Sequence, residues 1–292
     1  AASQTAIIRS IVKRKEDGCK KQSKLFMRLT VTAVTYPDHS EHTNQDAVIA
    51  KKSKTTDGRD AFFAVMCDGM GNHGQSAAAS IAAAFNSWFQ AFLEQKSADV
   101  SQTAIFKVWD AIVNRMSKRL FNELNDPDSA ATMAVFLIVD DIWYMMNVGD
   151  VRVYQITKDG VKQLSTDHTY AEREISLGHM DPMEAMADPM AFHVLQTIGN
   201  TKNIIASKAS GSIGEDSVFL ACTDGFYRHN RKSAIYRTFR PDSLDEGRES
   251  DALSETEENA LNNGETDDMS AVVIRIFKEK REDKARTGGE CA

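Results

Sequence analysis

The predicted elements of this chain are compatible with an α+β fold. Two amphipathic helices are expected at residues 75–95 and 101–124, because apolar side chains recur there at every third or fourth position. Apolar runs typical of strands come before and after them, at residues 61–67 and in a block spanning 133–156. The chain has 292 residues, of which 42% are hydrophobic and 26% charged, as in an ordinary soluble globular protein with a sizeable core.

The composition disfavours several locations and partners. The longest apolar stretch, residues 131–149, is interrupted by Asp140 and Asp141, and the N-terminus lacks the pattern of a secretion signal. We therefore expect a cytoplasmic protein without a membrane span. The four cysteines lack the C-x-x-C spacing of metal or redox sites, so we expect them to be small buried hydrophobic residues. The net charge of −7 argues against nucleic-acid binding.

The two ends of the chain are expected to lie outside the folded domain. Residues 8–28 carry a local excess of Lys and Arg, which is more often a solvated arm than a binding site. We therefore assign residues 1–28 to a basic N-terminal arm and residues 278–292 to a charged, frayed C-terminal tail. The folded domain is expected to span residues 29–277.

The stretch on which the rest of the chain depends is residues 61–80, where an apolar run ends at Asp68 and Gly69 and an alanine-rich helix follows. This pattern predicts a buried strand whose C-terminal end leaves the core. Gly69, Gly71 and Gly74 let the backbone turn tightly and bring a carbonyl close to whatever Asp68 binds. Because hard cations prefer carboxylate and carbonyl oxygens, we place the chemistry at this junction.

A second acid lies at the end of a neighbouring strand. Asp46 precedes a short apolar run, whereas Asp68 follows the run 61–67. The connecting segment contains Asp57-Gly58, a strong hairpin signal, which predicts that the two strands pair antiparallel. Both carboxylates then lie on the same edge of the sheet.

The block of strands supplies a third acid, Asp150. Two-residue connections join its three predicted strands, which indicates a meander of residues 133–139, 142–148 and 151–156. The following segment, residues 166–200, is irregular, with short helical patterns at 170–177 and 182–187. Such a composition is typical of a mobile surface flap.

The pattern of an apolar run, an acid and a glycine returns near the C-terminus. The predicted strand 217–222 leads into Asp224 and Gly225, and a last acid precedes the predicted strand 271–277. Five acids thus lie at strand ends: Asp46, Asp68, Asp150, Asp224 and Asp267.

One aspartate at a strand end is usually only a turn residue, but five together carry more weight. Carboxylates crowded on one edge repel one another and raise each other's pKa, so such a cluster is tolerated mainly when divalent cations neutralise it. An all-oxygen set without His or Cys favours Mg or Mn over Zn. Two such ions can activate a shared water for an in-line displacement at phosphorus.

A series of short motifs runs along the chain in a recognisable order. They are Asn44-Gln45-Asp46, Asp68-Gly69-Met70-Gly71-Asn72-His73 with Ala79-Ser80, residues 129–132, Asn147-Val148-Gly149-Asp150-Val151-Arg152, Leu164-Ser165-Thr166-Asp167-His168, residues 193–199, Thr223-Asp224-Gly225 and Asp267-Asp268-Met269-Ser270. In this series the chain resembles the metal-dependent serine/threonine protein phosphatases of the PPM, or type 2C, class, especially their bacterial branch. The resemblance covers roughly residues 29–277.

The resemblance implies a four-layer α-β-β-α sandwich, in which two central antiparallel β-sheets are flanked by helices and a binuclear Mn or Mg centre lies at one edge. By the family pattern, Asp68 bridges both ions, the Gly69 carbonyl and Asp46 hold one side, and Asp224 and Asp267 hold the other. Asp150 matches the family's acid at an optional third metal.

The activity that the resemblance implies is hydrolysis of phosphoserine and phosphothreonine monoesters in proteins. Water bridging the two ions attacks phosphorus directly, so Asp68 and Asp224 act through the metal-bound water. Phosphoproteins and a cognate serine/threonine protein kinase are the implied partners, and we expect a monomer.

Some residues depart from the family pattern. Glu41 stands where the family has an arginine that contacts the substrate phosphate, which leaves His42 as a candidate for that contact. Met70 stands where some members have a histidine proposed as general acid, for which His42 or His73 could substitute. Arg228 replaces an acid that in relatives helps the third metal, so we expect that ion to be weakly bound or absent.

Two other classes of function stay open. A pseudophosphatase would keep the fold and bind phosphoproteins without turnover, which Glu41 and Met70 suggest but the intact set of acids opposes. A structural or sensor module would hold metal ions for stability alone, which the exposed, glycine-lined edge opposes. Hydrolysis of a small aryl phosphate with and without Mn separates an enzyme from a binder.

Overall fold

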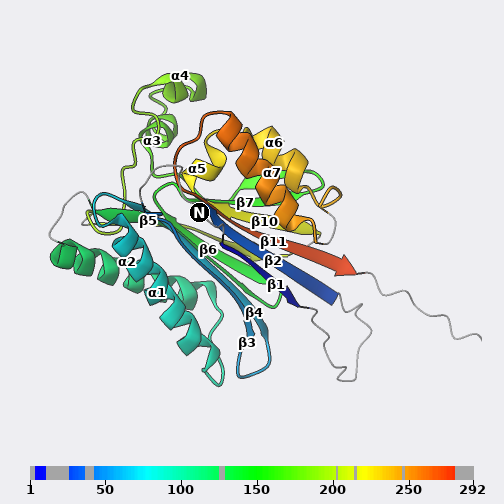
Figure 1. The fold of residues 1–292 in the computed structure, drawn as a ribbon. Helices are drawn as coiled ribbons and strands as arrows, with labels where there is room; N and C mark the ends of the chain where they lie inside the picture. Colours follow the sequence, from blue (N-terminus) through cyan, green and yellow to red (C-terminus); the bar gives the residue numbers. More distant parts are fainter. Residues whose placement is uncertain are drawn as a thin grey trace, which may run out of the picture.

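Two antiparallel β-sheets pack face to face, and helices cover both outer sides of the pair (Figure 1). The four-layer α-β-β-α sandwich expected from the family resemblance is thereby confirmed. This computed structural model describes residues 4–10, 26–36, 43–124, 129–201, 203–213, 216–244 and 247–279.

Each sheet contains strands from distant parts of the chain, and the paired neighbours in both are antiparallel. The six-stranded sheet has, in spatial order, β1 (Gln4–Ser10), β2 (Phe26–Tyr36), β11 (Met269–Glu279), β10 (Ser217–Cys222), β7 (Arg152–Thr157) and β8 (Gly160–Gln163). The five-stranded sheet has β3 (Ala47–Lys54), β4 (Asp60–Met70), β5 (Ala130–Val139), β6 (Ile142–Val148) and β9 (Ser207–Ser212).

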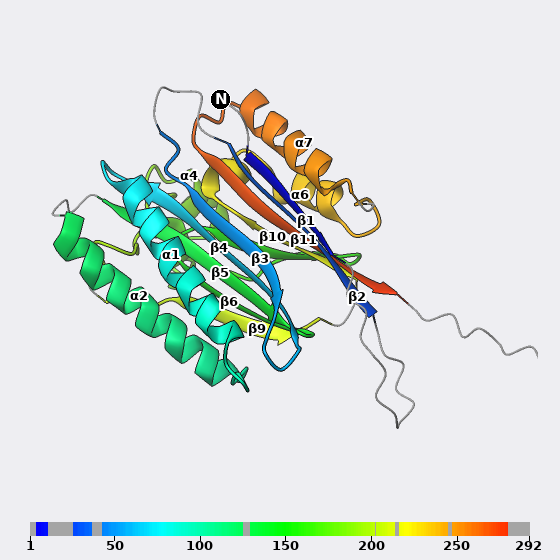
Figure 2. The ribbon, with the colours of Figure 1, turned by 60° about the horizontal axis from the view of Figure 1, so that its bottom comes forward.

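The helices fall into three groups. The predicted amphipathic pair, α1 (Gly74–Leu93) and α2 (Gln102–Leu124), lies over the five-stranded sheet, as Figure 2 shows. The six-stranded sheet is covered by α5 (Asp224–Tyr227), α6 (Lys232–Phe239) and α7 (Glu249–Asn262). The short helices α3 (Tyr170–Ser176) and α4 (Pro182–Ala187) project away from the sandwich (Figure 1). None of the helices among the described residues has both the length and the apolar character that a membrane span requires.

The core is layered because the central strands bury both of their faces. Along β4, Phe63 and Val65 pack towards the helices, whereas Phe62 and Met66 pack towards the other sheet. All four are at most 1% exposed. Full burial of one such side chain contributes about 1.5–3 kcal/mol, so this strand is firmly anchored up to the point where Asp68 leaves the core.

The meander predicted for residues 133–156 is wrong at its second connection. β5 and β6 form the expected hairpin, but β7 pairs with β10 and β8 in the opposite sheet. The reason is that β6 already has a neighbour on each edge, β5 and β9, so the chain must leave the sheet after Val148. Gly149 makes this step with a positive φ of 90°, and a Cβ at that position would lie 2.4 Å from the side chain of Thr132.

Several elements differ from the sequence prediction. β1 and the beginning of β2 lie within residues 1–28, which we assigned to an arm, so part of that segment adds a strand to the sheet. The strand β9, with the sequence SKASGS, has no apolar alternation and could not be recognised locally. Helix α6 consists largely of polar residues, although Ile235 and Phe239 anchor it in the core. The exact limits of the folded domain stay a prediction.

Candidate functional site

The expected pairing of the first two acidic strand ends is confirmed. β3 and β4 pair antiparallel with Ala47 opposite Cys67, so Asp46 and Asp68 follow at the same edge. The hairpin between them turns at the predicted Asp57-Gly58, where Gly58 has a φ of 85° and its N–H donates to the Thr55 carbonyl. Asp68 itself still belongs to β4, because its partner on β5 is Thr132.

The second pair of acids comes from the other sheet. Cys222, the last residue of β10, pairs with Ala271 of β11, so Asp224 and Asp267 lie beyond the same end of these two strands. The Thr223 hydroxyl donates a hydrogen bond to Asp46 Oδ2 over 3.1 Å. This contact joins the acidic edges of the two sheets.

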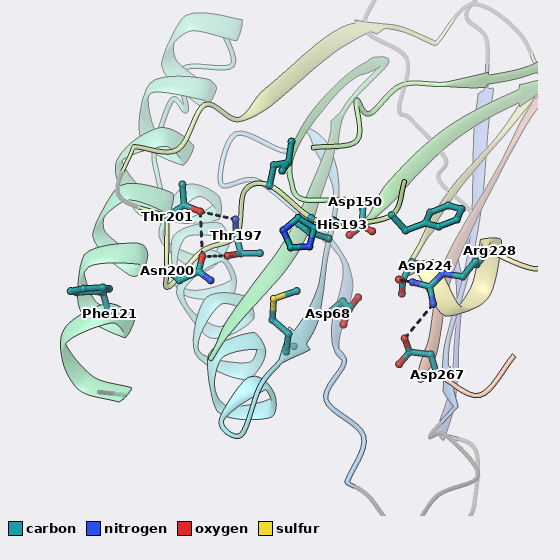
Figure 3. Close-up of a pocket in the computed structure, with 15 residues that line it drawn as sticks. Asp68, Phe121, Asp150, His193, Thr197, Asn200, Thr201, Asp224, Arg228 and Asp267 are labelled. Carbon is teal, nitrogen blue, oxygen red and sulfur yellow. Dashed lines mark hydrogen bonds and ion pairs between the residues drawn. The ribbon is translucent and has the colours of Figure 1, made fainter. Parts of the chain in front are cut away.

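Four of the five predicted acids line one open pocket with a volume of about 1030 Å³ (Figure 3). One wall carries Asp68, Asp150, Asp224 and Asp267, together with Gly69 and Met70. The opposite wall comes from the segment after α4 and from α2, and it consists of Phe121, His193, Val194, Leu195, Thr197, Asn200 and Thr201, whereas Phe192 of the same segment lies beside Arg228. The segment 166–200, predicted as a flap, therefore borders the acids. Asp46 does not line the pocket but lies at the same edge.

The acids raise one another's pKa, as the sequence predicts for a crowded edge. Burial, reinforced by the charges of Asp268 and Asp224, raises the pKa of Asp46 to about 8. The pKa of Asp68 rises well above its usual range, chiefly by burial and then by the charge of Asp46. Burial and the charge of Asp224 likewise raise the pKa of Asp150 to about 7 and that of Asp267 to about 6.

The donor set suits a hard divalent cation. Asp46 Oδ1 is buried and accepts no hydrogen bond, which leaves a carboxyl oxygen that a bound cation would satisfy. The other donors are carboxylates and the backbone around Gly69, the ligands that Mg²⁺ and Mn²⁺ prefer. Within the described residues, no three His, Cys, Asp or Glu side chains meet around a single point. The residues therefore fit the ions by chemistry, whereas the ligand assignment and the number of ions stay predictions.

Arg228 lies inside the acidic cluster, a contact that sequence reasoning did not foresee. Its guanidinium Nη2 donates to Asp224 Oδ2, and Nη1 lies 3.9 Å from Asp267 Oδ2 (Figure 3). The family pattern instead predicts Arg228 beside the third metal position, near Asp150. The local signal for the contact was its spacing of four residues from Asp224, which puts both side chains on one side of a helical turn.

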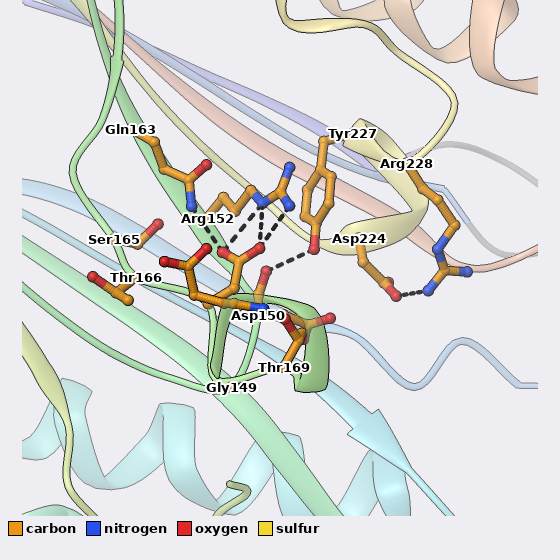
Figure 4. Close-up of polar contacts among 12 residues, drawn as sticks. Gly149, Asp150, Arg152, Gln163, Ser165, Thr166, Thr169, Asp224, Tyr227 and Arg228 are labelled. Atoms are coloured by element: carbon orange, nitrogen blue, oxygen red, sulfur yellow. Dashed lines mark hydrogen bonds and ion pairs between the residues drawn. The ribbon is translucent and has the colours of Figure 1, made fainter. Parts of the chain in front are cut away.

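A network of polar contacts fixes the position of the Asp150 loop (Figure 4). Tyr227 donates its hydroxyl to the Asp150 carbonyl over 3.0 Å, and Arg152 lies 3.7 Å above the Tyr227 ring. Arg152 also forms an ion pair with the buried Asp167 at 2.6 Å. The Asp150 loop is therefore tied to Tyr227, the last residue of α5, the helix that begins at Asp224. The sequence assigns Asp167 no role beyond its place in the motif Leu164-Ser165-Thr166-Asp167-His168.

None of the candidates for the general acid or the phosphate contact is placed in the pocket by the described residues. His42 and Glu41 lie outside the residues that the structure describes. His73 is exposed and does not line the pocket, and its backbone N–H donates to Ser129 Oγ. Met70 lines the pocket but carries no proton to donate. His193, which was not singled out, lies in the opposite wall.

Comparison with known proteins agrees with this geometry. The family model for protein phosphatase 2C matches residues 37–273. The chain therefore belongs to the protein phosphatase 2C family, whose members are serine/threonine protein phosphatases. No curated protein matches it by sequence.

Solved structures share the fold at low sequence identity. The chain is similar to the S. agalactiae serine/threonine phosphatase, with 17% identity, a TM-score of 0.71, and coverage of 87% of this chain and 100% of that one. The Staphylococcus aureus phosphatase Stp1 gives 19% identity, a TM-score of 0.70, and coverage of 90% and 99%. The catalytic domain of PstP, solved in complex with two manganese ions, gives 18% identity, a TM-score of 0.66, and coverage of 86% and 99%.

Proposed function

We propose that this chain hydrolyses phosphoserine and phosphothreonine monoesters in proteins, with two Mn²⁺ or Mg²⁺ ions held by Asp46, Asp68, the Gly69 carbonyl, Asp224 and Asp267. The observation that carries the proposal is the convergence of acids from both sheets on one pocket, with Asp46 Oδ1 left without a partner. When bound, the ions supply a water of lowered pKa and neutralise charge on the phosphate.

The side chains of the pocket favour direct attack by water over a covalent intermediate. Cys67 and Cys222 are buried, and burial raises the pKa of both thiols, so neither is a nucleophile. Among the described residues that line the pocket, there is no serine or cysteine. The hydroxyl of Thr197 is engaged with Asn200 Oδ1.

The two walls of the pocket have separate tasks in this proposal. Asp68 lies among Asp46, Asp150, Asp224 and Asp267, whose charges all act on it, so it is suited to link the two sides of the metal centre. The apolar side chains of Phe121 and Phe192 also line the pocket and offer apolar contacts to the residues that flank a phosphorylated serine or threonine. A third ion beside Asp150 is expected to be weak or absent.

The decisive assay is hydrolysis of a small aryl phosphate and of a phosphothreonine peptide with Mn²⁺, with Mg²⁺ and with excess chelator. We expect turnover only with added metal. Full activity in chelator would contradict the proposal, because it would require a nucleophilic side chain.

A catalytically impaired phosphatase that binds phosphoproteins is the second candidate. It is favoured by one observation, the ion pair between Arg228 and the predicted metal ligand Asp224. Binding of the peptide without turnover at any Mn²⁺ concentration would support it. Phosphoprotein substrates, a cognate serine/threonine protein kinase, a cytoplasmic location and a monomeric state stay predictions from the sequence.

A further inference from the structure

The two sides of the acidic cluster differ in how their charge is compensated. On the side of the five-stranded sheet, Asp46 Oδ1 is buried without a partner, and no ion pair forms on Asp46 or Asp68 within the described residues. On the other side, Asp224 and Asp267 share the guanidinium of Arg228. One side therefore lacks a cation, and the other already has one.

Arg228 is held in this position by more than one contact. Its backbone N–H donates to the Asp224 carbonyl over 2.7 Å, which fixes the helical turn between the two residues. Its guanidinium carbon lies 5.8 Å from the ring centroid of Phe192, which also lines the pocket. The side chain of Asp224 is only 11% exposed and that of Arg228 31%, so solvent screens their ion pair only in part.

The pocket offers no second side chain of this kind. Of the described residues that line it, Arg228 alone is a lysine or arginine (Figure 3). A divalent cation that binds Asp224 and Asp267 must displace the guanidinium or tolerate a like charge a few ångströms away, and either cost weakens its binding. A cation that binds Asp46 and Asp68 meets no such competitor.

We propose that Arg228 is a built-in competitor for the metal on the Asp224–Asp267 side, so that the two metal positions fill in order, the Asp46–Asp68 side first. The proposal rests on the proposed function, because it uses the same metal centre. It adds that the enzyme becomes complete only at a metal concentration set by Arg228. At lower concentrations the centre holds a single ion.

The test uses Mn²⁺ alone, without substrate, on the full metal-free chain. Isothermal titration calorimetry gives the two affinities, and electron paramagnetic resonance separates an isolated Mn²⁺ ion from a coupled pair. For the native chain we expect two binding steps that differ by about tenfold or more in Kd, with the spectrum of an isolated ion after the first step.

Arg228→Gln removes the competing charge and keeps a polar side chain of moderate length. We expect the second Kd to fall about tenfold while the first is unchanged, so that the coupled spectrum forms at lower Mn²⁺ concentration. Arg228→Lys keeps the charge without the fork-shaped guanidinium and should keep the two steps apart. Arg231→Gln, the same change at an exposed arginine that does not line the pocket, is the matched control and should leave both steps as in the native chain.

A second step that is unchanged or weaker in Arg228→Gln would overturn the proposal, since Arg228 would then be neutral or would orient Asp224 for the ion. A folded Arg228→Gln protein is confirmed by its thermal unfolding curve, and the lysine variant tests the same point if the glutamine variant is unstable. Ordered binding that depends on Arg228 but brings no phosphatase activity would instead sink the proposed function. Two equal steps with full activity would sink this inference alone.

Discussion

The same short pattern, an apolar run followed by aspartate and glycine, occurs at Asp68 and at Asp224, and the two copies end in different structures. β4 continues through Asp68 and Gly69 to Met70, so Asp68 faces Thr132 on the neighbouring strand. β10 stops at Cys222, and Asp224 is the first residue of helix α5, with Thr223 at its N-cap position. Local sequence alone does not distinguish these outcomes.

The difference in backbone decides which acid has a counterion. A helix brings residues four apart together, so the turn after Asp224 delivers Arg228 to its carboxylate. A strand points successive side chains to opposite faces, so no neighbour in sequence can do this for Asp68. Two acids of one cluster thus differ in charge compensation because Asp68 lies on a strand and Asp224 on a helix.

The largest effect is expected from neutralising the acids themselves. Asp68→Asn should lower kcat by about a thousandfold or more, because Asp68 is proposed to serve both ions and about 4 kcal/mol of transition-state stabilisation is lost. Asp224→Asn should also abolish most activity but should leave one Mn²⁺ bound. Steady-state kinetics and calorimetry measure both, with Asp141→Asn, an exposed turn residue, as control. Equal loss of Mn²⁺ binding in both variants would remove the distinction between the two sides.

Removal of metal should make the stability of the protein depend on pH. The folded state raises the pKa of Asp46 to about 8 and that of Asp150 to about 7, whereas aspartates of an unfolded chain titrate near 3.9. The folded chain therefore holds more protons than the unfolded chain between about pH 4 and pH 8, and its stability falls as pH rises through that range.

Thermal unfolding in chelator should show this as a Tm that drops by about 5 °C or more between pH 5 and pH 8, given that 1 kcal/mol corresponds to about 2–4 °C for proteins of this size. With saturating Mn²⁺ the drop should shrink, because bound cations neutralise the same carboxylates. A Tm in chelator that rises over this range would show that the acids are compensated by groups other than metal.

The two glycines of the repeated pattern provide the next comparison. A Cβ at Gly69 would lie 2.4 Å from the Gly74 carbonyl, and one at Gly225 would lie 2.3 Å from the Asp268 carbonyl oxygen. Each Gly→Ala variant should lose about 1–3 kcal/mol of stability, because backbone must shift in both cases. Gly69→Ala should weaken the first Mn²⁺ step and Gly225→Ala the second. The reverse assignment would contradict the proposed order of filling.

The smallest effect concerns the link between α5 and the Asp150 loop. Tyr227→Phe removes the hydroxyl that donates to the buried Asp150 carbonyl and keeps the ring under Arg152. We expect a loss of about 0.5–1.5 kcal/mol in the free energy of unfolding, measured by urea denaturation. Tyr236→Phe, whose hydroxyl bonds the Lys158 carbonyl at an exposed position, is the matched control and should lose less. Equal losses would mean that the Tyr227 hydroxyl stabilises the Asp150 loop no more than an exposed hydrogen bond does.

The sequence by itself determined the elements whose signal is local. The continuous apolar run before Asp68 predicted β4, because a strand buried on both faces needs apolar side chains at every position. The periodic apolar stripe predicted α2 to within a residue of its bounds, Gln102–Leu124, and Ser101 Oγ accepts a capping hydrogen bond from the Ala104 N–H. The edge shared by Asp46 and Asp68 also followed from the sequence, since the Asp57-Gly58 turn sets which strands pair.

Only the tertiary structure decided the features that depend on distant partners. β7 joined the opposite sheet because β9, more than fifty residues later in the chain, occupies the free edge of β6. The polar strand β9 forms because β6 offers it backbone hydrogen bonds, which no pattern of side chains records. The Arg228 contact with Asp267 is of the same kind, because it requires β10 and β11 to be paired before the two residues can meet. Local propensity specifies helices, strands and turns, whereas sheet membership and the charges that share a site depend on which distant strands become neighbours.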